Sequence, residues 1–97
     1  MELQQTSSGL SVVGALDRYN LVNKQQFEFP ELSLENIEID LSKAEPIDTS
    51  GLAWILKCVS NYHSRGKKTS ILNPPTQLIA LAELSNVLAL LPIQKAV

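Results

Sequence analysis

Asn36 to Ala53 reads Asn-Ile-Glu-Ile-Asp-Leu-Ser-Lys-Ala-Glu-Pro-Ile-Asp-Thr-Ser-Gly-Leu-Ala, and this stretch decides the fold. Its first part alternates apolar and acidic residues, which predicts a β-strand over residues 36–41 that is covered on one face only. A loop that contains a proline follows over residues 42–47. A helix is then predicted from about Thr49 to Arg65, because Gly66 stands where a helix-terminating glycine belongs.

Shorter elements are predicted on both sides of this strand-loop-helix step. They are a hairpin of strands over residues 2–6 and 10–13, a helix from Tyr19 to about Phe27, a strand from Lys68 to Leu72, and a helix from about Thr76 to Val87. The order β-β-α-β-α-β-α predicts an α/β fold in which a mixed four-stranded sheet carries helices mainly on one face. We expect one domain over residues 1–97.

The composition excludes several classes of function. With 44% hydrophobic residues, 19% charged residues and a net charge of −2, the chain lacks the basic character of a nucleic-acid-binding domain. Its single cysteine, Cys58, cannot form an internal disulfide, which favours a reducing compartment. No stretch approaches the roughly 20 apolar residues that cross a bilayer, and the N-terminus does not resemble a signal peptide. We therefore expect a cytoplasmic protein that reaches a membrane only through a partner.

Side chains for catalysis or for holding a metal ion are scarce. One histidine, His63, and one cysteine cannot make a zinc cluster, and four isolated glycines do not make a phosphate-binding loop. His63 and Cys58 are interpreted as structural side chains, because neither has a catalytic partner in the sequence pattern. The chain is expected to be no enzyme and to need no metal or cofactor.

The predicted central helix has a second face that its core does not require. On a wheel of about 100° per residue, one apolar stripe within roughly 120° consists of Leu52, Ile55, Leu56, Val59 and Tyr62. The opposite side carries Trp54, Ser50, Lys57, Asn61 and Arg65, with Cys58 on the flank. Either a neighbouring segment covers Trp54, or Trp54 is an exposed contact for a partner, since tryptophan is enriched at interface hot spots. An exposed tryptophan face would also allow pairing with a second copy.

Asp48-Thr49-Ser50-Gly51 stands at the predicted start of this helix, where backbone N–H groups lack partners. Asp, Thr and Ser all cap helices well, so capping alone explains the residue types. The alternative is a switch: a phosphorylated hydroxyl would place charge near the positive end of the helix dipole, beside Asp48. Such a modification would change which partner fits this loop.

At these residues the sequence resembles the STAS family, named after sulfate transporters and anti-sigma-factor antagonists. The family signature is a strand with a terminal aspartate, matched by Ile39-Asp40-Leu41-Ser42, then a loop and a helix start, matched by Asp48-Thr49-Ser50-Gly51-Leu52-Ala53. Gly14-Ala15-Leu16-Asp17 is similar to the step after the family's opening hairpin, and residues 78–87 resemble its last helix. The resemblance spans nearly the whole chain.

The resemblance implies a non-enzymatic protein-binding module. It is strongest to the Mla-type STAS subunit that binds and supports the cytoplasmic ABC ATPase of a phospholipid transporter, which maintains outer-membrane lipid asymmetry. The alternative branch is the anti-sigma-factor antagonist, which binds a kinase and is switched by phosphorylation; Thr49 and Ser50 are the candidate phospho-acceptors. A small-ligand carrier is a third, less favoured class. The predicted partner-binding residues are Asp48, Thr49, Ser50, Trp54, Lys57, Cys58 and Asn61.

Overall fold

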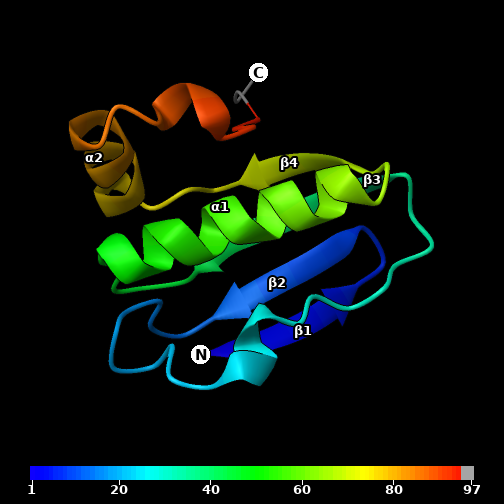
Figure 1. Ribbon diagram of the computed structural model, residues 1–97, viewed down its shortest axis with the longest axis horizontal. Helices are drawn as coiled ribbons and strands as arrows, with labels where there is room; N and C mark the ends of the chain where they lie inside the picture. The colour runs from blue at the N-terminus through cyan, green and yellow to red at the C-terminus, as the bar shows by residue number, and fades with distance from the viewer. Residues whose placement is uncertain (95–97) are drawn as a thin grey trace.

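A mixed four-stranded sheet forms the centre of the structure, a computed structural model that describes residues 1–94 (Figure 1). The antiparallel hairpin of β1 (Glu2–Thr6) and β2 (Gly9–Val13) comes first. β3 (Asn36–Lys43) pairs parallel with β2, and β4 (Lys68–Leu72) pairs parallel with β3, which gives the order β1-β2-β3-β4. The predicted fold class and sheet are therefore confirmed.

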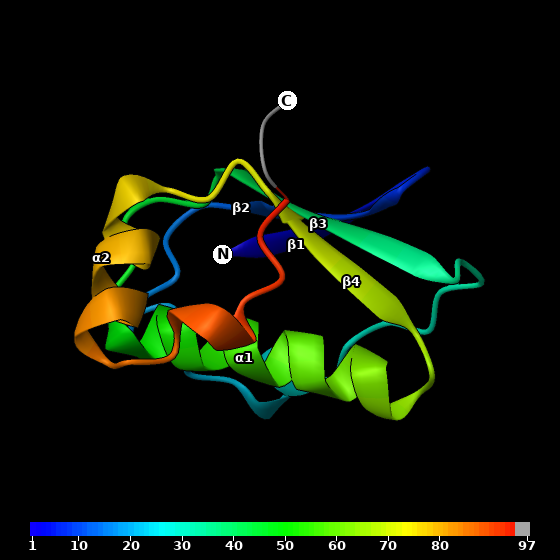
Figure 2. The same ribbon diagram turned by 90° about the horizontal axis from the view of Figure 1, so that it is seen from above.

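The helices lie on one side of this sheet, as predicted (Figure 2). α1 (Thr49–Ser64) runs across the sheet, and α2 (Thr76–Leu84) lies near the N-terminal end of α1. Two short 3-10 turns, η1 (Lys24–Phe27) and η2 (Leu88–Leu90), complete the described elements. Within residues 1–94, no helix is both long enough and apolar enough to cross a membrane.

The alternation of apolar and acidic residues in β3 buries one face of the strand, as predicted. Ile37, Ile39 and Leu41 are fully buried in the core beneath α1, whereas Glu38 and Asp40, on the opposite face, are only half-buried. The same core contains side chains from β2, β4 and both helices. Burial of large aliphatic side chains contributes about 1.5–3 kcal/mol each, so this single layer between sheet and helices provides most of the stability.

The predicted helix from Tyr19 to Phe27 is wrong. The Asp17 side chain accepts hydrogen bonds from the backbone N–H groups of Tyr19 (3.1 Å) and Asn20 (3.0 Å), and these bonds form a turn. Only the 3-10 turn η1 follows, and the chain then runs alongside α1 in an extended form. The last helix is also shorter than predicted, because Asn86 adopts a left-handed conformation (φ 58°) just beyond the end of α2.

The expectation that Trp54 is exposed is also wrong, since its side chain is fully buried. Residues 26–30 lie over the side of α1 that the wheel left uncovered, and Phe29 packs on Trp54 with ring centroids 5.3 Å apart. The indole nitrogen of Trp54 donates a hydrogen bond of 2.7 Å to the carbonyl of Gln26. Cys58, predicted on the flank, is fully buried as well. The alternative in which a neighbouring segment covers Trp54 is therefore correct, and pairing with a second copy through an exposed Trp54 loses its basis.

The crossing segment, residues 26–30, is held by its backbone carbonyls. Besides Trp54, the hydroxyl of Tyr62 donates to the carbonyl of Pro30 over 2.8 Å. The guanidinium of Arg65 donates to the carbonyl of Phe29 over 3.0 Å. These carbonyls have no partner within the segment, and buried carbonyls must be paired, so the side chains of Trp54 and Tyr62 in α1 and of Arg65 just beyond it satisfy them.

Candidate partner-binding site

The start of α1 is built where two backbone segments meet, the chain that leaves β2 and the loop before the helix. The N–H of Leu16 donates to the carbonyl of Pro46 over 2.9 Å, and the N–H of Asp48 donates to the carbonyl of Leu16 over 3.2 Å. This pairing continues the parallel relation of β2 and β3 as an isolated bridge between Leu16 and Ile47. The loop before α1 is therefore fixed by the chain that leaves β2.

Gly51 is required by this arrangement. A Cβ atom at this position would lie 2.1 Å from the carbonyl oxygen of Leu16 and 2.9 Å from its Cβ. Neither neighbour is the end of a flexible side chain, so even alanine would force the loop and the helix apart. The glycine in Asp48-Thr49-Ser50-Gly51 is thus explained by close packing of the backbone.

Asp48 caps the helix and ties a second loop to it. Its Oδ1 accepts hydrogen bonds from the N–H groups of Ser50 (2.9 Å) and Gly51 (3.2 Å), and its Oδ2 accepts one from the N–H of Arg18 (3.0 Å). Burial alone would raise the pKa of Asp48, but the hydrogen bonds from Arg18, Gly51 and Ser50 outweigh it and lower the pKa. Both carboxylate oxygens are therefore engaged in positioning the loop.

The side chains of Thr49 and Ser50, unlike that of Asp48, take no part in capping the helix. Thr49 is the first residue of α1 and its side chain is exposed, whereas Ser50 is half-buried. Both hydroxyls lie at the positive end of the helix dipole, where a negative group is stabilised by about 0.3–1 kcal/mol. The Thr49 hydroxyl is thus accessible to a partner surface or to a modifying enzyme without disturbing the cap.

The site also includes a neighbouring turn, with Arg18 and Tyr19, that the sequence did not predict. Arg18 follows Asp17 in the turn that Asp48 holds, and its guanidinium lies 5.1 Å from the ring centroid of Tyr19. Tyr19 is 74% exposed and Val22, three residues on, is 70% exposed. These residues were predicted to form a helix, so the sequence pattern gave no reason to treat them as an exposed turn.

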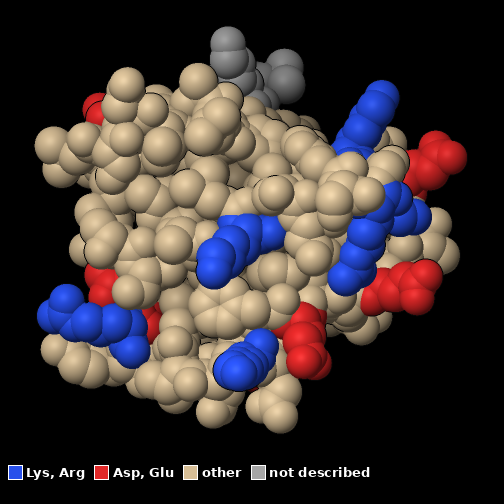
Figure 3. Space-filling view, in the orientation of Figure 1, with Lys and Arg blue, Asp and Glu red and all other residues tan. Residues whose placement is uncertain are grey.

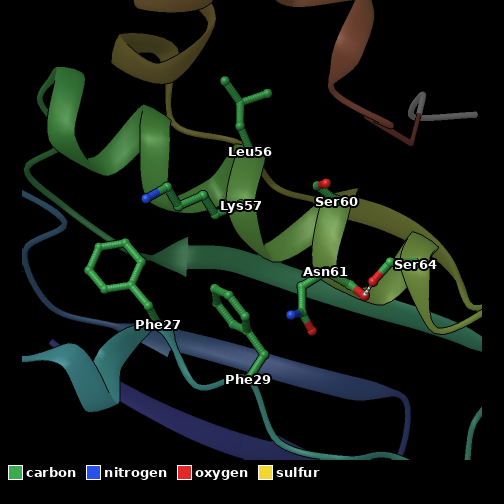
Figure 4. Close-up of a pocket in the computed structure, with 7 residues that line it drawn as sticks. All are labelled: Phe27, Phe29, Leu56, Lys57, Ser60, Asn61 and Ser64. Carbon is green, nitrogen blue, oxygen red and sulfur yellow. Dashed lines mark hydrogen bonds between the residues drawn. The ribbon is translucent and has the colours of Figure 1, made fainter.

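The outer face of α1 carries a groove beside the crossing segment (Figure 4). The groove has a volume of about 480 Å³, and its lining residues are Phe27, Phe29, Leu56, Lys57, Ser60, Asn61 and Ser64. The ammonium of Lys57 lies 4.9 Å from the ring centroid of Phe27. Two of the predicted partner-binding residues, Lys57 and Asn61, are thus on an accessible surface.

The seven predicted partner-binding residues divide into three groups. Asp48, Thr49 and Ser50 are together at the start of α1, and Lys57 and Asn61 line the groove. Trp54 and Cys58 are fully buried and cannot touch a partner in this conformation, which corrects their prediction as surface contacts. Burial also raises the pKa of the Cys58 thiol to about 12, so the group stays protonated and unreactive.

The charged side chains on the face of the molecule shown in Figure 3 do not form one large patch of a single sign. Lys and Arg side chains alternate with Asp and Glu around the loops and strand ends, while the surface over α2 and η2 is nearly free of charged groups. That surface includes Leu84, which is 85% exposed, and Leu90, which is 63% exposed. Within the part of the chain that the structure describes, no group of three or more His, Cys, Asp or Glu side chains is arranged to hold a metal ion.

Comparisons with known proteins agree with this architecture. A family model described as "Mlab, STAS domain" matches residues 1–92, so the chain belongs to the STAS family. No curated protein sequence matches the chain significantly.

Two solved structures are similar to the fold. The NMR structure of the protein TM1081 shares 21% sequence identity at a TM-score of 0.68, over 97% of this chain and 79% of the other. The anti-sigma-factor antagonist SpoIIAA in its unphosphorylated form shares 15% identity at a TM-score of 0.61, over 97% of this chain and 87% of the other. At these identities the two structures support the fold alone.

Proposed function

We propose that this chain is a non-enzymatic subunit that binds the cytoplasmic ABC ATPase of a phospholipid-transporting complex and supports its activity. The complex would maintain the lipid asymmetry of an outer membrane, and the chain would reach the inner membrane only through this partner. The observation that carries the proposal is the match of residues 1–92 to the Mlab-type STAS model, together with an exposed Thr49 on a rigidly capped helix start.

The geometry of the helix start supports binding rather than catalysis. Asp48 uses both carboxylate oxygens in backbone hydrogen bonds, and a base or nucleophile needs a free, positioned group. The groups that this region presents outward are the exposed Thr49 side chain and, in the turn that Asp48 holds, the exposed ring of Tyr19. A rigid loop with a small polar centre and an aromatic neighbour is typical of a protein-protein contact.

A second candidate function is that of an anti-sigma-factor antagonist, which a kinase would switch by phosphorylating Thr49 or Ser50. The observation that favours it is the exposure of Thr49 at a helix N-terminus. There the fold would tolerate a phosphate because of the dipole, while a complementary partner surface would not. This switch needs no rearrangement of the core.

The two candidates make different predictions for a pull-down of the tagged chain from its native bacterium without crosslinking. The first predicts recovery of an ABC ATPase and its membrane subunit, with Thr49 unmodified by mass spectrometry. Recovery of a small kinase instead, with phosphate on Thr49 or Ser50, would reject it and support the second.

A matched pair of variants sharpens this test. Thr49→Glu places a negative charge on the first residue of α1 and is expected to abolish recovery of the ATPase. Thr76→Glu makes the same change on the first residue of α2, which is also exposed, and should leave recovery unchanged. Equal recovery with both variants would show that the helix start of α1 is not the contact.

A further inference from the structure

The two edges of the sheet differ in how their backbone groups are paired. At the β4 edge, residues 92–94 run beside Ile71, whose N–H donates to the carbonyl of Pro92 over 2.8 Å and whose carbonyl accepts from the N–H of Gln94 over 3.0 Å. β1 is the outermost strand on the other side and pairs only with β2 (Figure 1). Among residues 1–94, the β1 edge is therefore left open.

The hydrogen-bond pattern identifies the backbone groups of β1 that point outward. The carbonyl of Ser8 accepts a hydrogen bond of 2.9 Å from β3, so the next residue, Gly9, turns its backbone groups toward β1. Gly9 lies opposite Thr6, and hydrogen-bonded pairs alternate along an antiparallel ladder. Leu3 and Gln5 therefore direct their N–H and C=O groups away from β2, toward the place of a further strand.

β1 lacks the features that usually protect a sheet edge from pairing. From Leu3 to Thr6 the strand has no charged residue and no proline, and its register with β2 is regular, without a bulge. The side chains of Gln4, Gln5 and Thr6 are exposed. An open strand of this kind can bind another extended segment through main-chain hydrogen bonds.

A hollow beside this edge indicates which side chain an added strand would carry. Its volume is about 210 Å³, and its lining residues, from the beginning of β1 and from the region of η1, are Met1, Leu3, Asn23, Gln25, Gln26 and Glu28. Leu3 lies opposite the buried Val12, so its side chain is on the face of the sheet that carries the helices. Met1 and Leu3 are half-buried, and an aliphatic side chain packed on them would remove apolar surface from water.

The charge of the hollow indicates a second residue of the added strand. Glu28 is the only charged lining residue and is exposed, while the other polar lining residues have neutral amide side chains. A Lys or Arg two positions from the aliphatic residue would lie on the same face of the strand and would be attracted to this carboxylate. An Asp or Glu at that position would be repelled.

We propose that the β1 edge binds an extended segment of a second protein, in which an aliphatic side chain enters the hollow and a Lys or Arg two positions away pairs with Glu28. β1 itself contains no Lys or Arg, so a second copy of this strand does not supply the pattern. The inference stands apart from the function proposed above, because it concerns the edge of the sheet and not the start of α1.

The test selects a library of random heptapeptides, displayed on phage, against the purified chain. Enriched peptides are synthesised with fluorescein, and their affinity is measured by fluorescence anisotropy. We expect them to carry an aliphatic residue with a Lys or Arg two positions away. Methylation of single backbone nitrogens of such a peptide should weaken binding by on the order of 10-fold or more at every second residue only, because alternate N–H groups face β1.

Two pairs of variants locate the bound peptide. Gln5→Pro removes an outward N–H and should weaken binding by on the order of 10-fold or more, whereas Gln5→Ala keeps the N–H and should bind like the wild type. Glu28→Lys should also weaken binding, whereas Glu31→Lys makes the same charge change on an exposed residue outside the hollow and should have no effect. Circular dichroism verifies that each variant is folded.

Weak binding by Gln5→Pro and Glu28→Lys, with normal binding by their controls, supports the assignment. The absence of enriched peptides, enrichment of peptides without the expected pattern, or equal binding by Gln5→Pro and Gln5→Ala overturns it. If Gln5→Pro does not fold, the alternating effect of backbone methylation and the comparison of Glu28→Lys with Glu31→Lys decide the question. None of these results changes the function proposed for the start of α1.

Discussion

The two sides of α1 are covered in physically different ways. The side that faces the sheet packs through apolar side chains such as Ile55 and Val59, and its stabilisation is spread over many contacts. The other side is covered by residues 26–30, an irregular segment whose carbonyls accept hydrogen bonds from Trp54, Tyr62 and Arg65. The difference teaches that the second side depends on a few identifiable atoms, so single substitutions can release it.

The largest effect is expected from Trp54→Ala. This change removes a fully buried ring, its contact with Phe29 and the hydrogen bond to Gln26, and it should lower the free energy of unfolding by about 3–5 kcal/mol. Urea denaturation followed by circular dichroism measures the change. A loss below about 1 kcal/mol would mean that the crossing segment does not rest on Trp54.

At the start of α1, the carboxylate of Asp48 makes side-chain-to-backbone hydrogen bonds like those of the crossing segment, but this side chain carries a charge. Asp48→Ala should lower the free energy of unfolding by about 1 kcal/mol at neutral pH, whereas Asp48→Asn, which can still cap, should cost less. The comparison requires urea titrations of all three proteins at a series of pH values.

The sign of the pH dependence follows from the lowered pKa of Asp48. A carboxylate whose pKa is lower in the folded than in the unfolded chain stabilises the fold fully above its ordinary value of 3.8. The contribution is lost as the pH falls through the lower, folded pKa. The difference between wild type and Asp48→Asn should therefore shrink in acid, and a difference that grows in acid would contradict the hydrogen-bond assignment.

Tyr62→Phe tests a single contact of the crossing segment. It removes only the hydroxyl that donates to Pro30 and should lower the free energy of unfolding by about 1 kcal/mol, because the carbonyl keeps only the longer hydrogen bond of 3.3 Å from Arg65. Tyr19→Phe makes the same chemical change on a side chain that is 74% exposed and should have almost no effect. Equal effects of the two variants in thermal unfolding would refute the role given to Tyr62.

The smallest effect, and one of opposite sign, is expected from Asn61→Leu. The side-chain oxygen of Asn61 is buried without a hydrogen-bond partner within residues 1–94, and leucine also favours the helix. The free energy of unfolding should rise by about 0.5 kcal/mol or more. Asn61→Asp, which keeps the volume but places a charge there, should lower it. Stabilisation combined with weaker ATPase binding would indicate that Asn61 serves binding at the expense of stability.

The sequence predicts those parts of the fold that local patterns determine. The alternation in β3, the glycine after α1 and the residue types at Asp48 and Gly51 depend on neighbours close in the chain, and the structure has the strands and the helix start where they were expected. The resemblance to the STAS family on these residues is confirmed as well.

The coverage of α1 could not be predicted in this way. Trp54 and Gln26 are 28 residues apart, and a helical wheel contains no information about an extended segment that returns over the helix. The prediction of a helix over Tyr19–Phe27 gave no indication that the chain near its end, at Gln26 and Pro30, lies against Trp54 and Tyr62. The groove with Phe27 and Phe29 was missed for the same reason.

Hydrogen-deuterium exchange on the chain, free and in complex with the ABC ATPase, tests the central claim most directly. The account predicts that bound ATPase slows exchange at the start of α1, around Thr49 to Ala53, and in the crossing segment at residues 26–30. Exchange in β1, at the sheet edge away from α1, should be unchanged. Protection that falls on β1 or α2 instead, or no protection at all, would contradict the claim that the capped start of α1 is the partner-binding surface.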